Sequence, residues 1–258
     1  MGTRVAISAA AIVAVALMVA ACSMSQYSEP RASWRAAAEE QCLASGLVKS
    51  SPYVQATEDP PGKGSCGMSR PIKVSAFHDG AVAVAPPATI NCPMTAALDR
   101  WMGGPVQQAG RRYFGQPVVG IKQIASYGCR GRNGSHFGPL SEHAFGNALD
   151  IAAFRLADGR EITVLQGWWR GTPQEKAFLR EAFISACAEF YTVLGPGSDR
   201  YHSNHFHVDL LLTNAKGSRH YCRPLPNRNP EDTPTAFLSD AEPSRPRPKP
   251  LAFTGDLY

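Results

Sequence analysis

The residues best suited to chemistry lie in two short stretches, 141–154 and 202–212, which together hold four of the seven histidines. In a β-strand, residues two apart point to the same face of the sheet. The second stretch therefore presents His205, His207 and Asp209 on one face of an expected strand. The opposite face carries the apolar residues Phe206, Val208 and Leu210, which can pack on a core and hold the polar face rigid.

The first stretch alternates in the same way around an acid. Asp150 shares a face with Ala148 and Ala152, whose small side chains leave room beside the carboxylate. His143 stands on the turn that enters this strand, just ahead of Gly146. We therefore expect a histidine and a carboxylate from the first stretch to lie near the histidines of the second.

Two imidazoles and one carboxylate on neighbouring strands form an open three-ligand set for zinc, in which the fourth position is left for water. Residues of these types are His143, Asp150 and His207. The same ligand types hold non-haem ferrous iron, so residue chemistry alone does not separate the two metals. The alternative is a set of structural, hydrogen-bonded histidines. Four histidines beside an acid, with alternating spacing, favour the metal site.

At these residues a family resemblance emerges. The motif His-x-x-Gly-x-Ala-x-Asp, from His143 to Asp150, is followed some fifty residues later by His205-x-His207. This combination resembles the zinc peptidases that include lysostaphin, D-alanyl-D-alanine carboxypeptidases and penicillin-insensitive murein endopeptidases. The phrase SEHAFGNALDIAAF is more closely similar to the extensin-like protein C-terminal domain family of bacterial envelopes. The resemblance covers about residues 40–223.

The resemblance implies that His143, Asp150 and His207 are the zinc ligands and that His205 lies beside the metal. Many of these peptidases place a Glu or Asp, as general base, three residues before the last ligand. Here that position is Asn204. An amide cannot take a proton from water, so the proton must be handled by another residue.

Two histidines are the candidates for this catalytic role. The murein endopeptidase branch has a histidine five residues before the last ligand, which corresponds to His202 here, and His205 is the other candidate; neutral imidazole suits proton transfer near neutral pH. The resemblance also implies that Arg130 contacts substrate; the alternative is an arginine on a solvated loop. Ser141 is a further substrate-side candidate, although it is better suited to orienting the strand entry than to acting as a nucleophile. His136 either contacts substrate or lies on a solvated loop.

The N-terminus predicts export. Residues 1–21 contain one basic residue, Arg4, and then an apolar run, which indicates a secretory signal peptide rather than a permanent transmembrane helix. The sequence Val-Ala-Ala-Cys ending at Cys22 looks like a bacterial lipobox, in which the cysteine receives lipid; an ordinary signal peptide is the alternative. We expect a periplasmic protein, and Ser23 after a lipidated cysteine favours the outer membrane. Residues 22–31 are an expected spacer.

Six cysteines follow Cys22, and an even number in an oxidising compartment predicts up to three disulfides. Six cysteines allow fifteen connectivities, among which the sequence does not choose. We expect a single domain over residues 32–222 and a Pro-rich, disordered tail over 223–258. The disulfide candidates are Cys42, Cys66, Cys92, Cys129, Cys187 and Cys222.

Helix and strand signals predict one α+β domain, in which a mainly antiparallel sheet carries the metal site on one face and helices cover the other. The resemblance implies the hedgehog/DD-peptidase-like version of this class. The predicted elements are a helix over 32–47, a loop over 51–67, strands within 71–85, two helices within 94–114 separated near Gly103-Gly104-Pro105, a buried strand over 117–127, a hairpin of 147–154 with 161–165, and a helix over 173–194.

The formal net charge of +5 suits acidic envelope polymers, and no motif for nucleic acid is present. The export signal, the set of metal ligands and the resemblance together predict a zinc-dependent peptidase that cleaves cross-links or stem peptides of peptidoglycan, held at the membrane by an N-terminal lipid. One alternative is a non-catalytic peptidoglycan-binding or structural lipoprotein, which Asn204 favours. Another is an iron-dependent oxygenase, which the export signal disfavours. No oligomeric state is predicted.

Overall fold

The computed structural model describes residues 30–60, 64–135, 138–212 and 220–224. The predicted signal peptide, Cys22, most of the spacer, His136 and the tail beyond Pro224 lie outside these ranges. Within the ranges, no helix has the length and apolar character needed to span a membrane.

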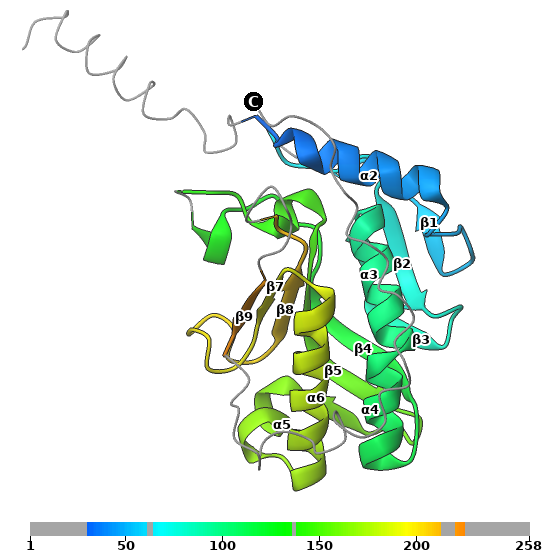
Figure 1. Cartoon of the computed structure of the whole chain (residues 1–258), viewed down its shortest axis with the longest axis vertical. Coiled ribbons are helices and arrows are strands. Elements are labelled where there is room, and N and C mark those ends of the chain that lie inside the picture. Colours follow the sequence, from blue (N-terminus) through cyan, green and yellow to red (C-terminus); the bar gives the residue numbers. More distant parts are fainter. Residues whose placement is uncertain (1–29, 61–63, 136–137, 213–219, 225–258) are drawn as a thin grey trace, which may run out of the picture.

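The described residues form a sheet with helices packed on it (Figure 1). The strands are β1 (Val54–Ala56), β2 (Ile72–Phe77), β3 (Val82–Ile90), β4 (Val118–Ala125), β5 (Ala148–Leu156), β6 (Glu161–Thr163), β7 (Thr192–Leu194), β8 (Phe206–Asp209) and β9 (Tyr221–Arg223). The α-helices are α2 (Ser33–Ser45), α3 (Cys92–Gly103), α4 (Pro105–Phe114), α5 (Val164–Arg170) and α6 (Pro173–Glu189). Two 3₁₀ turns are η2 (Arg132–Gly134) and η3 (Glu142–Phe145).

The strands form one sheet in the order β1-β2-β3-β4-β5-β8-β7-β9, with β6 paired to β5 off this path. β3 pairs with β4 and β7 with β9 in parallel, whereas the other pairs are antiparallel. The α+β class is thereby confirmed, with a mixed, largely antiparallel open sheet.

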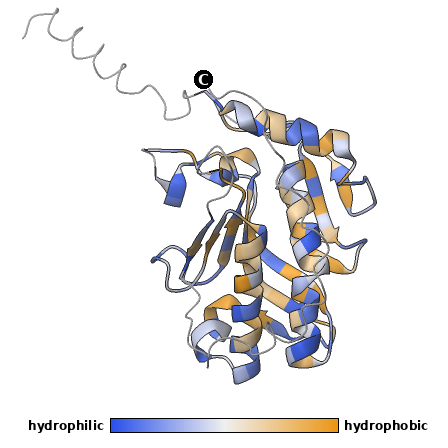
Figure 2. Ribbon diagram, in the orientation of Figure 1, coloured by the Kyte–Doolittle hydropathy of each residue, from blue (hydrophilic) through white to orange (hydrophobic). Residues whose placement is uncertain are grey.

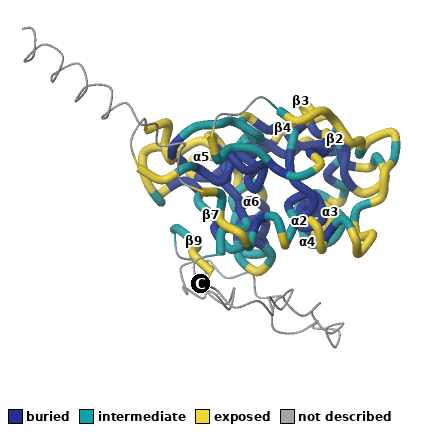
Figure 3. Tube along the Cα trace, turned by 90° about the horizontal axis from the view of Figure 1, so that it is seen from above, coloured by how far each residue is buried: buried dark blue, intermediate teal, exposed yellow. Residues whose placement is uncertain are grey.

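Helices α3 and α4 follow one another along one face of the sheet and α6 lies beside them, and buried residues concentrate between these helices and the strands (Figures 1 and 3). Phe154 of β5 lies at the centre of this core. Its ring contacts those of Trp101, Phe178 and Phe206 at centroid distances of 6.1, 5.3 and 6.2 Å. Figure 2 shows hydrophobic and hydrophilic residues in the same strands. In β8, Phe206 and Val208 belong to the core, which leaves His207 and Asp209 on the opposite face of the sheet.

The predicted break between two helices is confirmed at Gly104, which separates α3 from α4. The predicted helix over 32–47 is also confirmed, since α2 ends at Gly46 in the left-handed conformation that glycine favours (φ 64°). The strands predicted within 71–85 are also present, since β2 pairs with β3 through a hairpin at Asp79-Gly80.

The predicted helix over 173–194 is wrong in its last turn. Helix α6 ends at Glu189, and Phe190 adopts extended backbone with its side chain fully buried. Residues 192–194 form β7, in which Thr192 pairs with Asp209. β-branched residues tolerate both states but favour strands, and here pairing with β8 decides the outcome.

Three other boundaries differ from expectation. The predicted loop over 51–67 contains β1, which pairs with β2 at the edge of the sheet. The predicted strand over 161–165 ends at Thr163, because the Thr163 hydroxyl caps α5 by accepting from the Gln166 N–H. In the second chemistry-bearing stretch only β8 is a strand, and the residues before it form a turn.

Three disulfides are present, as predicted: Cys42–Cys92, Cys66–Cys129 and Cys187–Cys222. The first joins α2 to the start of α3, and the third joins α6 to β9. The second joins the segment before β2 to the loop after β4, one residue from Arg130. Covalent links therefore fix the segments that flank the predicted metal ligands.

Candidate metal site

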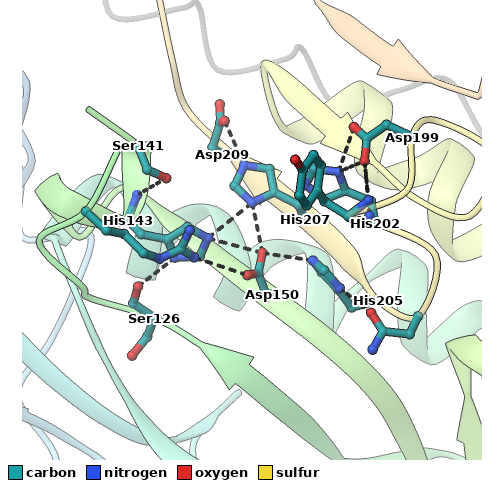
Figure 4. A network of polar contacts seen from close by, with 12 residues as sticks. Ser126, Ser141, His143, Asp150, Asp199, His202, His205, His207 and Asp209 are labelled. Carbon is teal, nitrogen blue, oxygen red and sulfur yellow. Dashed lines mark hydrogen bonds and ion pairs between the residues drawn. The ribbon is translucent and has the colours of Figure 1, made fainter. Parts of the chain in front are cut away.

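The three predicted metal ligands meet on the polar face of the sheet (Figure 4). Asp150 of β5 pairs in register with His207 of β8, and His143 lies on η3 just before β5. Asp150 Oδ1 lies 3.1 Å from His143 Nε2 and 2.8 Å from His207 Nδ1. All three side chains are buried, and no other such group of possible ligands occurs among the described residues.

Local backbone structure aims these side chains. The Ser141 hydroxyl caps η3 by accepting a hydrogen bond from the His143 N–H at 3.4 Å. Gly146 then ends η3 with φ 60°, a conformation that side-chain-bearing residues rarely adopt. After this turn, Leu149 and Ile151 enter the core and leave Asp150 on the opposite face.

Hydrogen bonds outside the ligand set fix both imidazole rings. His143 Nδ1 donates to the Ser126 carbonyl oxygen at 2.6 Å, and His207 Nε2 donates to Asp209 Oδ2 at 3.0 Å. The remaining nitrogens, His143 Nε2 and His207 Nδ1, therefore face each other at 3.2 Å beside Asp150. Two ring nitrogens so close to each other and to a carboxylate require a shared proton or cation between them. Hydrogen bonds from the other ring nitrogen to a carbonyl or carboxylate oxygen, as made here with Ser126 and Asp209, are characteristic of histidine metal ligands.

Burial and hydrogen bonding act in opposite directions on these groups. Burial alone lowers the pKa of His207, but its hydrogen bonds to Asp150 and Asp209 outweigh that effect and raise it to about 10. Burial alone raises the pKa of Asp150, but hydrogen bonds from His143 and His207 hold it well below its usual range. In the metal-free protein, a proton on His207 thus supplies the positive charge between the two carboxylates.

His205 lies beside the ligands with one ring nitrogen unpaired. Its Nδ1 donates to Asn204 Oδ1 at 2.8 Å, which leaves Nε2 as an acceptor. Nε2 is buried without a hydrogen-bond partner and lies 3.5 Å from Asp150 Oδ1. Burial lowers the pKa of His205 to about 4, against the opposing attraction of Asp150. The site therefore contains a neutral, unpaired acceptor directed at the ligand cluster.

His202 completes the histidine group. Its Nδ1 lies 2.8 and 2.9 Å from the two carboxylate oxygens of Asp199, so it donates to that carboxylate and leaves Nε2 as an acceptor. The ring centroid of His202 lies 5.2 Å from that of His205 and 5.6 Å from that of His207. The structure thus brings together both histidines expected to handle a proton.

Comparison with known proteins adds one match. The model of the family described as "Extensin-like protein C-terminus" matches residues 40–223, well over half of the chain. The chain belongs to the extensin-like protein C-terminal family. No curated protein and no solved structure matches it. The matched segment of this extensin-like domain contains all the histidines and acids of the candidate site.

The two expected substrate residues of the extensin-like domain lie at different depths. The Arg130 side chain is 39% exposed, and its Nη2 lies 3.8 Å from Asp150 Oδ2, at the border of the site. Ser141 is buried, and its hydroxyl is engaged with the η3 backbone. His136 lies outside the described residues.

Sequence reasoning missed three partners in the extensin-like site. The role of Ser126 was not visible because it acts through its backbone carbonyl. Asp199 lies in the turn before His202, and its carboxylate also accepts a hydrogen bond from the Tyr201 N–H. Asp209 was placed on the correct face by its spacing from His207, but its role as the hydrogen-bond acceptor of that ring was not predicted.

Proposed function

We propose that this extensin-like protein is a zinc-dependent peptidase that cleaves peptide cross-links or stem peptides of peptidoglycan. The observation that carries the proposal is the convergence of His143 Nε2, His207 Nδ1 and Asp150 Oδ1, with the unpaired His205 Nε2 directed at the same place. Two imidazole nitrogens and one carboxylate oxygen match the donor set of an open catalytic zinc site.

The residues fit zinc in chemistry as well as in number. His143 and His207 each donate one ring N–H to an oxygen outside the ligand set, and Asp150 is ionised. A bound metal would take the place of the proton on His207 Nδ1. A zinc ion held by these three residues would lower the pKa of a bound water molecule and polarise the carbonyl group of a substrate. Ferrous iron uses similar ligands, but hydrolysis requires no oxidant and is the simpler reaction for this set.

The two outer histidines have separable roles in this proposal. His202 donates Nδ1–H to Asp199, and this carboxylate stabilises the ring when Nε2 takes a proton, so we assign His202 as the general base. His205 has only the neutral Asn204 amide as partner, so we assign its Nε2 to orienting a water molecule by accepting a hydrogen bond. Together, the two histidines would perform the role of the carboxylate base, whose usual position is occupied here by Asn204.

Arg130 provides a positive group for the substrate. Its guanidinium is partly exposed at the border of the ligand cluster, where a carboxylate or a developing oxyanion can reach it. The basic net charge of +5 also suits the acidic groups of a cell-wall polymer. Peptidoglycan as partner, anchorage through lipid on Cys22 and a periplasmic, outer-membrane-anchored location belong to the same proposal, as does kinship with the murein endopeptidases and the DD-peptidase fold.

A second function has one observation in its favour. Asn204 occupies the position of the usual carboxylate base and binds His205 through its amide oxygen. A non-catalytic envelope lipoprotein that holds zinc for stability or grips peptidoglycan has no need of that base. This alternative predicts peptidoglycan binding without cleavage.

The deciding experiment is digestion of purified peptidoglycan by the full-length chain carrying Cys22→Ser, with muropeptides read by mass spectrometry. We expect cross-linked muropeptides to decrease with added zinc and to persist with a chelator. His205→Asn should abolish the decrease, whereas His78→Asn, at an exposed turn, should not. Unchanged muropeptides from zinc-loaded protein would contradict the peptidase and favour the binding lipoprotein.

A further inference from the structure

A buried ion pair links the N-terminal helix to the turn that carries His143. Arg35 of α2 donates two hydrogen bonds to Glu142 of η3, from Nη1 to Oε2 and from Nη2 to Oε1, both 2.7 Å long. The two side chains are only 8% and 3% exposed, and they are 107 residues apart in sequence. Glu142 immediately precedes the metal ligand His143, so the pair acts next to the site.

The guanidinium of Arg35 is fixed on several sides. It stacks on the Phe145 ring at 3.8 Å and on the Trp34 ring at 4.3 Å. Glu142 Oε2 also accepts a hydrogen bond from Asn147 Nδ2 at 2.7 Å. Arg35 therefore contacts η3 on both sides of His143, through a carboxylate before the ligand and an aromatic ring after it.

Helix α2 is itself firmly attached, so Arg35 is a fixed support. The Cys42–Cys92 disulfide joins the helix to α3. Glu39, almost fully buried, accepts the Ser69 N–H at 2.8 Å and pairs with Arg31 at 2.6 Å. These attachments hold α2 in place, so Arg35 is fixed relative to the rest of the domain and in turn fixes Glu142 of η3.

We propose that Arg35 is a positioning residue for the metal site, which sets the place of His143 through the bidentate pair with Glu142. This inference rests on the proposed metal function of His143. The family match begins at residue 40, so Arg35 lies outside the segment by which the family is recognised. The working site of this chain thus extends to a helix that begins before the matched domain.

The geometry of η3 explains why such a support matters. The turn has only four residues, and its backbone is held by hydrogen bonds such as Ala144 N–H to the Ser141 carbonyl at 2.9 Å and Asn147 N–H to the Glu142 carbonyl at 3.0 Å. The pair with Arg35 adds an attachment of the Glu142 side chain to a different element, α2. A planar guanidinium fixes both oxygens of Glu142, whereas a lysine ammonium fixes a point charge only. Arg35→Lys therefore keeps the charge and removes the orientation.

The test compares Arg35→Lys with Arg112→Lys in the full-length chain. Arg112 binds the buried Glu181 carboxylate through both oxygens at 2.8 and 2.9 Å, between α4 and α6 and away from the site. Zinc affinity is measured by competition with a chromophoric chelator, alongside the thermal midpoint. We expect zinc binding about tenfold weaker in Arg35→Lys, the scale of second-layer effects at metal sites, and no change in Arg112→Lys.

A metal-free readout keeps this inference separate from the proposed function. The His143 Nδ1–H, buried against the Ser126 carbonyl, should give a slowly exchanging signal in ¹⁵N-histidine spectra of the metal-free protein. The signal should weaken in Arg35→Lys only. If the wild-type chain binds no zinc, the zinc proposal fails, while this signal still decides whether Arg35 positions the ring.

Two results would overturn the proposal. One is wild-type zinc affinity together with an unchanged His143 signal in Arg35→Lys. The other comes from the neutral double variant Arg35→Met/Glu142→Gln, which also serves if the single variant does not fold. Restored zinc affinity in that variant would mean that the pair merely neutralises charge, whereas a folded variant with weak zinc binding supports positioning.

Discussion

Asp209→Asn is the sharpest test of how the outer partners control the metal ligands. The Asp209 carboxylate meets two donors at once: Oδ2 accepts from His207 Nε2 at 3.0 Å, and Oδ1 accepts from the Leu211 N–H at 2.9 Å. Asparagine has a single oxygen. If that oxygen stays with Leu211, the amide NH₂ faces His207 Nε2 and forces the ring proton onto Nδ1, the nitrogen needed by the metal.

The size of the effect follows from this mismatch. Leaving one buried donor without an acceptor, or holding the ring in the wrong tautomer, costs about 1–3 kcal/mol. Each 1.4 kcal/mol is tenfold in a binding constant, so zinc affinity should fall by roughly 5- to 150-fold. Titration against a chromophoric chelator at constant pH measures this change directly.

The matched control is Asp99→Asn. Asp99 Oδ1 accepts the His78 N–H at 2.7 Å, a bond that an asparagine oxygen can keep. Zinc affinity should therefore be unchanged. An Asp209→Asn protein that is folded and binds zinc as tightly as the wild type would refute the reasoning that His207 ligates through Nδ1 with Asp209 behind it.

Three further outcomes are expected. His202→Gln and Asp199→Asn should each lower the rate of peptidoglycan cleavage by about 10²-fold or more while zinc still binds, because they act on the proposed proton acceptor; equilibrium dialysis and muropeptide yield separate the two effects. Gly146→Ala should destabilise the fold by at least about 1 kcal/mol in urea unfolding, since φ is 60° and the new Cβ would meet the Met68 side chain. Zinc at 100 times its dissociation constant should stabilise the wild type by about 2.7 kcal/mol, seen as a raised thermal midpoint, and His143→Ala should remove this shift.

The ligand types and their faces were predictable because strands alternate with period two. His207 and Asp209 share a face of β8, as Asp150 and its small neighbours do on β5, and both sets followed from spacing alone. His205 precedes β8 and approaches Asp150 from the turn, so its place was not fixed by strand alternation as expected. The distances between the two stretches were not predictable in the same way. They depend on the register of β5 against β8, which pairs Asp150 with His207 and is fixed by packing on the core.

Other features lay beyond local patterns. The turn of His143 depends on Arg35, a residue more than a hundred positions away that no motif marks. The three disulfide pairings needed the fold itself, because six cysteines permit fifteen arrangements. Residues 192–194 continue an apolar pattern that suits a helix, but the open edge of β8 captures them as a strand.

The long span between Arg35 and Glu142 has a consequence for the order of folding. A chain that has emerged only as far as residue 135 already contains α2, α3 and the Cys42–Cys92 pair, yet it has neither Glu142 nor any of the three ligands. Bringing Arg35 and Glu142 together closes a long loop, and the entropy cost of closing it is met before the contact stabilises the chain. Contacts between residues so far apart in sequence form slowly. Helix α2, the first helix of the described residues, is therefore synthesised long before its partner Glu142. The three ligands come together only after β8, near the end of the described chain, has paired with β5.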